Sequence, residues 1–215
     1  MTIGVISFQG DFQRHIDRFV SVGAPVEPVR TRTALDRVDA VVIPGGESTT
    51  IGMLLDRFGM LTALRDRIRD GLPVFGTCAG TILLADEIAN STQPRIGGLD
   101  ITVERNAYGR QIDSFEADLA VSPEWSISVT QQNDRDTSDH TDVDLPVRGV
   151  FIRAPIIVRT GASVRVLMSF EGRPVLVQSG AILAATFHPE MTADLRIHRY
   201  FYERVASGQT VRSAL

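Results

Sequence analysis

Residues 72–80 read Leu72-Pro73-Val74-Phe75-Gly76-Thr77-Cys78-Ala79-Gly80, and this stretch decides the fold class. The apolar run that ends at Gly76 predicts a buried strand, and residues 81–89 predict a helix soon after it. Cys78 therefore lies at a strand-to-helix junction, which is the pattern of a nucleophile elbow with cysteine in place of serine. The glycines on either side of Cys78 have no Cβ atom, so the tight turn is not crowded. The start of a helix favours the thiolate form of a cysteine placed there. A buried structural cysteine is the alternative interpretation.

Short β-branched runs alternate with amphipathic stretches through the first half of the chain. This alternation predicts a parallel sheet with helices on both faces. From about residue 101, strand-like runs follow one another without long helices between them, until a closing helix. The expected strands are 3–8, 25–29, 39–43, 72–76, 101–103, 115–121, 149–152, 156–158, 163–170, 174–179 and 181–187, and the expected helices are 12–22, 48–58, 61–69, 81–89 and 193–205.

The composition limits the class of protein. Of 215 residues, 43% are hydrophobic and 22% are charged, which is typical of a chain with a packed core. We expect a single domain over residues 1–206, with a polar insert at about 122–146 and a frayed tail at 207–215. The net charge of -4 argues against sequence-independent binding of nucleic acid. No apolar run approaches the roughly 20 residues that span a membrane.

Cysteine and lysine usage narrows the chemistry further. The single cysteine excludes an internal disulfide and, with no signal-peptide pattern at the start, favours a cytoplasmic location. All 22 basic residues are arginines, so Schiff-base chemistry is excluded because it needs a side-chain primary amine. We expect no cofactor and no metal. A calcium loop is one interpretation of the acidic stretch 133–144, but Asp139 stands where an EF-hand needs glycine, so we expect a solvated loop.

His188-Pro189-Glu190 follows the last expected strand. In an extended backbone, side chains two residues apart project to the same side, so Glu190 can accept a hydrogen bond from one ring nitrogen of His188. The other nitrogen then faces Cys78 for proton transfer, because both segments follow strands at the edge of the sheet where ligands bind. A solvated surface histidine is the alternative. The other histidines are expected to be structural or solvated: His15, His140 and His198.

Pro44-Gly45-Gly46-Glu47-Ser48 ends the third expected strand and opens a helix, for which Ser48 is the expected N-cap. Backbone amides at such a helix start can donate hydrogen bonds to an oxyanion. A phosphate-binding loop is one alternative, but the Walker pattern needs a lysine that this chain lacks. A plain tight turn is the other alternative.

Together these motifs resemble the class I (triad) glutamine amidotransferases, and within them the glutaminase subunits of pyridoxal 5'-phosphate synthases. The resemblance covers most of the chain, through the runs 7–12 with His15, 44–50, 76–80, 105–111, 151–155 and 188–190. It implies an α/β fold, a flavodoxin-like three-layer sandwich with a mostly parallel central sheet and extra antiparallel strands in the second half. The polar stretch at about 122–146 is longer than the family usually carries and touches none of these motifs.

The resemblance also implies a site. Cys78, His188 and Glu190 would form a catalytic triad, with the backbone amides of Gly46 and Ala79 as the oxyanion hole. Cys78 would attack the side-chain amide carbon of L-glutamine, and water would hydrolyse the resulting thioester to glutamate after ammonia leaves. The implied glutamine contacts are Gly46, Glu47, Ser48, Arg105, Ile152 and Arg153. An arginine fork suits the α-carboxylate, whereas Glu47 either pairs with the α-ammonium or only caps the helix.

Members of this family pass ammonia to a (β/α)8-barrel synthase subunit, expected here in a dodecamer of heterodimers, and are nearly inactive without it. The missing lysines fit this division, because the imine-forming amines of pyridoxal phosphate assembly must then belong to the partner. We expect part of the docking surface and a gate on the oxyanion hole to come from Gln9, Gly10, Asp11 and His15. The alternatives are a cysteine hydrolase or peptidase on a related sheet, and a silent scaffold subunit, which would predict a damaged triad.

Overall fold

Five neighbouring parallel strands form one side of the chain's main sheet and carry the candidate site. The computed structural model describes residues 1–105, 114–125 and 146–208. The main sheet has nine strands, and its first five neighbours pair in parallel while the other four extend it with antiparallel pairs. The order is β2 (Val26–Val29), β1 (Ile3–Ile6), β3 (Ala40–Ile43), β4 (Val74–Thr77), β12 (Ile182–Ala185), β11 (Arg173–Ser179), β10 (Arg165–Phe170), β7 (Phe115–Val121) and β8 (Val147–Phe151).

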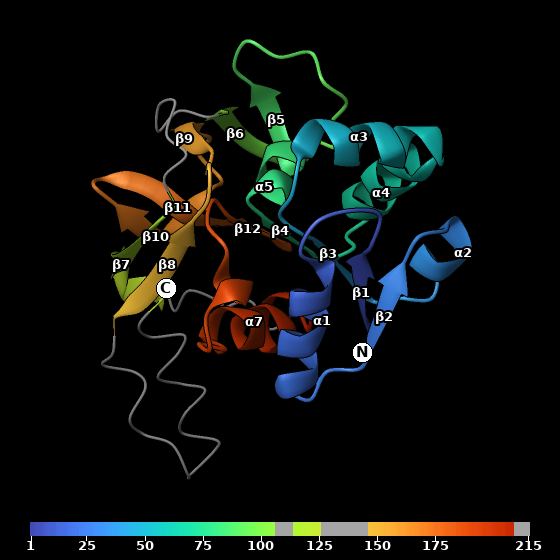
Figure 1. The fold of residues 1–215 in the computed structure, drawn as a ribbon, viewed down its shortest axis with the longest axis horizontal. Coiled ribbons are helices and arrows are strands. Elements are labelled where there is room, and N and C mark those ends of the chain that lie inside the picture. The colour runs from blue at the N-terminus through green and yellow to red at the C-terminus, as the bar shows by residue number, and fades with distance from the viewer. Residues whose placement is uncertain (106–113, 126–145, 209–215) are drawn as a thin grey trace.

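Alternate side chains of the parallel strands face two separate cores. In β3, Ile43 packs in the core under α3 (Ser48–Arg57), α4 (Met60–Arg69) and α5 (Ala79–Leu84), whereas Val42 packs in the opposite core. The opposite core is covered by α1 (Phe12–Ser21) and α7 (Arg196–Tyr200). Figure 1 shows α3 and α4 above the parallel strands and α1 and α7 below them. The sequence prediction of a three-layer α/β sandwich is therefore confirmed.

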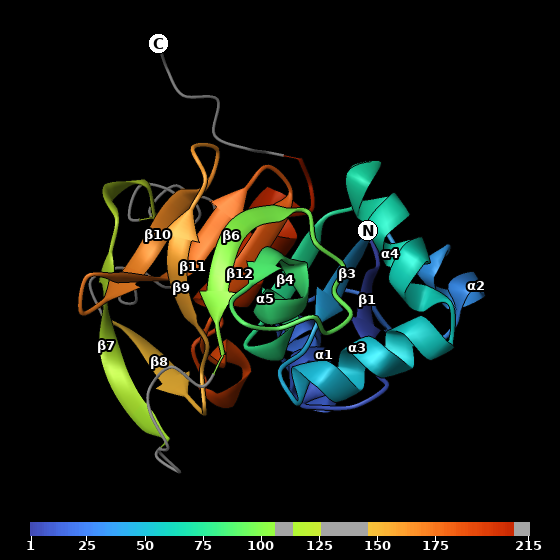
Figure 2. The same cartoon turned by 90° about the horizontal axis from the view of Figure 1, so that it is seen from above.

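A second, three-stranded sheet lies beside the antiparallel half. It contains β5 (Ala85–Ile88), β6 (Leu99–Glu104) and β9 (Ile156–Thr160), in that order. Figure 2 shows the helix-covered parallel strands on one side of the molecule and strands β7, β8 and β10 on the other. Among the described residues, no helix has both the length and the apolar character to cross a membrane.

The expected helix at 81–89 is the main error of the sequence prediction. Helix α5 ends at Leu84, and Ala85 turns to an extended conformation that begins β5. β5 pairs with β6 and buries Ala85 and Ile88 while its two acidic residues point outward. Strand pairing and this burial outweigh the helical propensity of the stretch, which is a weak local preference.

Smaller differences concern two helices. α2 (Arg32–Leu35) was not expected, and Thr31 caps it by accepting a hydrogen bond from the Ala34 amide. The closing helix starts at Arg196 and continues as the π-helix η2 (Phe201–Val205), later than the expected start at residue 193. The acidic stretch 133–144 with His140, most of the run 105–111 and most of the tail 207–215 lie outside the described residues.

The turn after β4 depends on a close approach between backbones. Cys78 adopts a positive φ of 46°, which non-glycine residues rarely do, and it joins β4 directly to α5. Gly80, in the first turn of α5, lies so near β3 that a Cβ atom there would be 2.1 Å from the Ile43 carbonyl oxygen. A backbone oxygen cannot move aside as a flexible side chain can. The packing of this fold therefore requires glycine at position 80, two residues after the cysteine.

Replacing Gly80 with alanine should destabilise the fold strongly. Overpacking against backbone should cost at least about 3 kcal/mol, and so lower Tm by roughly 6–12 °C in a chain of this size. Gly59→Ala is the matched control, because Gly59 has a φ of 66° but no atom within 4 Å of the added Cβ. That change should cost only about 1–2 kcal/mol for the left-handed backbone. Thermal unfolding of both variants measures the difference, and equal losses would contradict the packing argument.

Candidate active site

Four loops meet at the carboxyl edge of the parallel strands. They follow β1, β3, β4 and β12, which are neighbours in the sheet, so their ends lie at the same edge. A cavity of about 210 Å³ opens there. Ten of the residues singled out in the sequence line it: Gln9, Asp11, Gly46, Glu47, Ser48, Cys78, Arg105, Ile152, Arg153 and His188. Ile82, which was not singled out, lines it as well. The residues brought together from across the chain are thus those expected around a substrate.

Strand pairing holds the cysteine in place. The Cys78 amide donates a hydrogen bond to the Ala185 carbonyl of β12 over 2.8 Å, and the hydroxyl of Thr81 donates to the same oxygen over 2.6 Å. The Cys78 Sγ lies 3.9 Å from the carbonyl oxygen of Ile152, and the residue is 5% exposed. The sulfur is therefore shielded but reaches the cavity, as a nucleophile requires.

His188 is fixed from three sides. Its amide donates to the Val150 carbonyl over 2.8 Å, and its Nδ1 donates to Glu190 Oε1 over 2.7 Å. The ring lies over Gly45 so closely that a Cβ atom at that glycine would be 2.4 Å from His188 Cε1. With Nδ1 engaged by Glu190, the ring's Nε2 is the nitrogen left to interact with Cys78.

The contact between His188 and Glu190 was expected, but the backbone that makes it was not. The sequence argument assumed an extended His-Pro-Glu segment, and that assumption is wrong. Pro189 begins the short 3-10 helix η1 (Pro189–Met191), and proline suits the first position of a helical turn because its missing N–H is not needed there. The tight turn brings the Glu190 carboxylate within 2.7 Å of His188 Nδ1.

The charges of His188 and Glu190 support each other. Burial disfavours a charged His188 ring, but its interactions with Cys78 and Glu190 outweigh burial and raise the pKa of His188 to about 10. Burial likewise opposes ionisation of Glu190, yet the neighbouring His15 and His188 lower the pKa of its carboxyl group. At neutral pH the ring is therefore an imidazolium, which places a positive charge beside the Cys78 sulfur.

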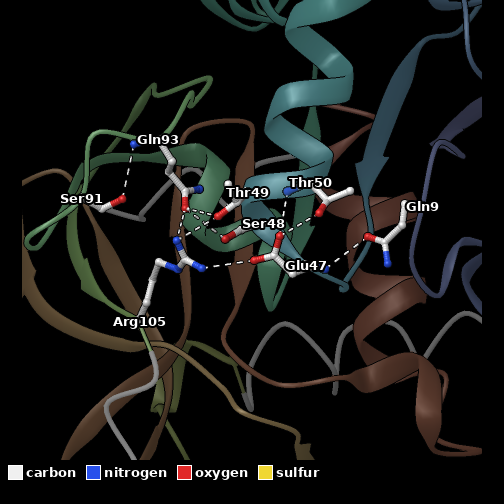
Figure 3. Close-up of polar contacts among 8 residues, drawn as sticks. All are labelled: Gln9, Glu47, Ser48, Thr49, Thr50, Ser91, Gln93 and Arg105. Carbon is white, nitrogen blue, oxygen red and sulfur yellow. Dashed lines mark hydrogen bonds and ion pairs between the residues drawn. The ribbon is translucent and has the colours of Figure 1, made fainter.

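A polar network surrounds the start of α3 (Figure 3). Arg105 donates to Glu47 Oε1 over 3.2 Å, to Thr49 Oγ1 over 3.1 Å and to Gln93 Oε1. Partial burial opposes ionisation of Glu47, but hydrogen bonds from Thr50 and the charge of Arg105 lower the pKa of its carboxyl group. Arg105, which lines the cavity, is thus held in place by three partners.

The N-cap of α3 is Glu47, and the expectation of Ser48 at that position is wrong. Glu47 Oε2 accepts hydrogen bonds from the amide and hydroxyl of Thr50, whereas Ser48 is already helical and its hydroxyl donates to Gln93 Oε1. Gln93 was missed altogether, because it comes from an irregular loop with no motif around it. Only the folded chain shows that its oxygen joins Ser48, Thr49 and Arg105.

The segment before α1 lies against the loop after β3. Gln9 Oε1 accepts a hydrogen bond from the Glu47 amide over 3.2 Å, and the Asp11 amide donates to the Gly45 carbonyl over 3.2 Å. Gly10 lies between these two contacts. His15, grouped with them in the expected docking surface, is completely buried, so a docking subunit cannot touch its side chain in this conformation.

One set of donor atoms in the described part of the chain is close enough together for a metal ion. Atoms of Asp11, His188 and Glu190 lie within 4.8 Å of one another. His188 Nδ1 and Glu190 Oε1 already hydrogen-bond to each other, so we assign no metal there. A larger groove of about 800 Å³ lies between α4 and the loop before β6, but the residues that line it include no cysteine or histidine.

The fold and this site define the class of protein. A solved structure described as a glutamine amidotransferase superposes with a TM-score of 0.82 at 43% identity, covering 95% of this chain and 98% of its own. The family model of the SNO glutamine amidotransferases matches residues 5–207. This chain belongs to the SNO glutamine amidotransferase family.

Named relatives are similar over nearly the whole chain. A protein of Carboxydothermus hydrogenoformans named pyridoxal 5'-phosphate synthase subunit PdxT is 50% identical over 208 residues, which cover 97% of this chain and all of that protein. A protein of the same name from Pelotomaculum thermopropionicum is 49% identical over 213 residues, covering 99% of this chain and all of its own.

Replacing Glu190 with glutamine should lower the pKa of His188. The amide keeps a hydrogen-bond acceptor but removes the negative charge, so we expect the His188 titration to fall from about 10 by roughly one to two pH units. NMR titration of the labelled histidine measures this. Glu47→Gln is the control, because Glu47 is a carboxylate of the same cavity that makes no contact with the ring. An unchanged midpoint in Glu190→Gln would show that Glu190 does not support the charge.

Proposed function

We propose that this chain hydrolyses L-glutamine to L-glutamate and ammonia through a thioester on Cys78. We further propose that it supplies the ammonia to a synthase subunit that builds pyridoxal 5'-phosphate. The observation that carries the proposal is the buried His188 ring, which interacts with both Cys78 and Glu190 beside one cavity. Membership of a glutamine amidotransferase family and the printed names of the relatives support the same reaction.

The first half of the reaction uses the Cys78 thiolate and the His188 imidazolium. The Cys78 thiolate attacks the side-chain amide carbon of glutamine, the new C–S bond forms, and the carbonyl electron pair moves onto oxygen. The backbone amides of Gly46 and Ala79 hold this oxyanion, a contribution of roughly 3 kcal/mol per donor. His188 gives its proton to the amide nitrogen as the C–N bond breaks, and ammonia leaves.

The second half reverses the role of the histidine. Neutral His188 takes a proton from water as the water oxygen attacks the thioester carbon. The C–S bond then breaks, glutamate leaves, and the thiolate–imidazolium pair is restored. Glu190 keeps its charge throughout and favours the imidazolium, which is the state that starts the next cycle.

The polar residues of the cavity suit the two charges of the amino acid. Arg105, held by Gln93 and Thr49, presents a planar fork to the α-carboxylate. Glu47 caps α3 through Oε2 and pairs with Arg105 through Oε1, so it can serve both as cap and as partner of the α-ammonium. Gly46, Ser48, Ile152 and Arg153 also line the cavity.

The segment Gln9 to Asp11 is proposed as gate and docking contact. Its hydrogen bonds hold the Gly45–Glu47 backbone, which includes the proposed oxyanion donor Gly46. A partner that moves this segment would therefore reorient the donor. We propose a (β/α)8-barrel synthase subunit as that partner, in a dodecamer of heterodimers. Residues 1–206 are proposed to act as one domain, which the nine-stranded sheet built from both halves of the chain supports.

Replacing Cys78 with alanine should abolish glutamine hydrolysis. Removing the nucleophile is expected to lower kcat at least about 10⁴-fold, because no other group can form the thioester. The assay measures glutamate released by the complex with the synthase subunit. As control, the same complex supplied with ammonium salt should still form pyridoxal 5'-phosphate. Glutamine hydrolysis that persists in Cys78→Ala would refute the proposed nucleophile.

The barrel subunit should accelerate glutamine hydrolysis by this chain. If docking repositions the segment Gln9 to Asp11, the oxyanion donors align only in the complex, and loss of one donor costs roughly 100–1000-fold in kcat. Glutaminase turnover measured with and without the partner tests this, with a synthase subunit that cannot bind the chain as control. Equal rates would contradict partner activation.

A further inference from the structure

Two buried histidines stand behind the proposed triad. His15 on α1 and His198 on α7 are both completely buried, and their rings meet with His15 Nδ1 3.1 Å from His198 Nε2. On its other side, His15 Nε2 lies 3.0 Å from Thr77 Oγ1 and 3.4 Å from Glu190 Oε2. From the sequence we expect both rings to be structural or solvated, with His15 also in the docking and gate segment, but in the structure they extend the polar chain inward from the active site.

The neighbours of these rings select their tautomers. Glu190 Oε2 is buried and has no hydrogen-bond partner among the described residues, while its carboxyl group is ionised. A negative oxygen facing His15 Nε2 favours a proton on that nitrogen. His15 Nδ1 then accepts, and His198 Nε2 donates to it.

With these tautomers, the one ring nitrogen left without a partner is also the one whose burial costs the least free energy. His198 Nδ1 is buried with no partner among the described residues, and here it carries no proton. The reverse tautomers would bury an N–H with no acceptor and turn a lone pair of His15 toward the carboxylate. Both rings are neutral at neutral pH, because burial lowers the pKa of each.

Helix α1 also holds the backbone of the same segment. Arg18, one turn after His15, donates through Nε to the Glu190 carbonyl oxygen over 3.3 Å. α1 therefore contacts Glu190 at its side chain and at its main chain. The helix begins at Phe12, directly after the segment that holds the loop of Gly45 and Glu47.

We infer that His15 is a positioning residue of the active site: its Nε2–H lies 3.4 Å from the unpartnered Oε2 of Glu190, attracts that oxygen, and so keeps the carboxylate that supports His188 in its orientation. The inference rests on the proposed function, because it assigns His15 a part in that reaction. It also ties the orientation of Glu190 to helix α1.

Loss of the His15 donor has a consequence for pH dependence. A carboxylate with one oxygen unsupported is less stable as an anion and attracts the imidazolium less strongly, so the ring of His188 loses its proton at lower pH. The other charged groups facing these rings are Asp11, whose carboxylate lies near His188 and Glu190, and Arg18, which acts on His198. Both remain in a variant of His15, so His15→Leu removes only the contacts of the His15 ring itself, with Glu190, Thr77 and His198.

The test compares His15→Leu with His15→Gln in the complex with the synthase subunit. Leucine fills similar space without a donor, whereas glutamine keeps an N–H at comparable reach. We expect His15→Leu to lower kcat roughly 10–100-fold with KM for glutamine changed less than about twofold. In the profile of kcat against pH, the alkaline limb should shift to lower pH by about one unit. His15→Gln should recover most of the rate and the position of the limb.

Phe19→Leu is the packing control. Phe19 lies on the same helix, is buried, and packs edge-on against the His198 ring with centroids 5.0 Å apart, but it has no hydrogen bond to give. It should lower Tm without moving the alkaline limb. If it moves the limb as far as His15→Leu does, or if His15→Leu leaves the limb in place, the inference is overturned.

If His15→Leu does not fold, a measurement on the wild-type chain tests the inference instead. In ¹⁵N-histidine NMR of the wild-type protein, with signals assigned through His15→Gln, His15 and His198 should both appear as Nε2–H tautomers. A proton on Nδ1 of His15 would overturn the inference. This readout needs no glutamine hydrolysis, so its failure is distinguishable from failure of the proposed function, which the activity of the wild-type complex and Cys78→Ala report.

Discussion

The structure around the cavity depends on one buried ion pair system, the His188 ring between the Cys78 sulfur and the Glu190 carboxylate. Burial alone would strip the proton from the ring, and it would also neutralise the carboxyl group. Interactions with Cys78 and Glu190 keep the ring charged, and the charge of His188 is among the interactions that keep the carboxyl group ionised. A buried charge left without its partner costs several kcal/mol, so the two side chains must be delivered to each other within hydrogen-bond distance. The rest of the fold can be understood as the means of doing this.

Neighbouring parallel strands bring Cys78 and His188 together. Ala185 at the end of β12 lies opposite Thr77 at the end of β4, so the residues that follow them enter the same cavity. The antiparallel half of the sheet adds two backbone carbonyls that β4 and β12 do not provide. The carbonyl of Val150 fixes the main chain of His188, and the carbonyl of Ile152 approaches the sulfur. The extra strands of the second half are therefore part of the active-site wall.

Much of this was predictable from local patterns. The elbow around Cys78 and the pairing of His188 with Glu190 follow from residue types at fixed spacing, and the alternating runs predict the three layers. The error at residues 85–88 has a cause outside the local pattern, since β5 replaces a helical turn only because β6 lies beside it. The role of Gln93 likewise depends on contacts between residues distant in sequence, which no local pattern carries. A buried histidine such as His15 gives no periodic signal of its polar partners.

Helix α1 illustrates why such contacts matter beyond stability. The ten residues from Gln9 to Arg18 contact the loop after β3 at one end and Glu190 at the other. The hydrogen bonds within a short helix hold its residues at fixed spacing, so the positions of His15 and Arg18 are set relative to Asp11, which precedes the helix. The loop after β3 and the carboxylate behind His188 are thus connected through α1 and the segment before it, although they follow different strands.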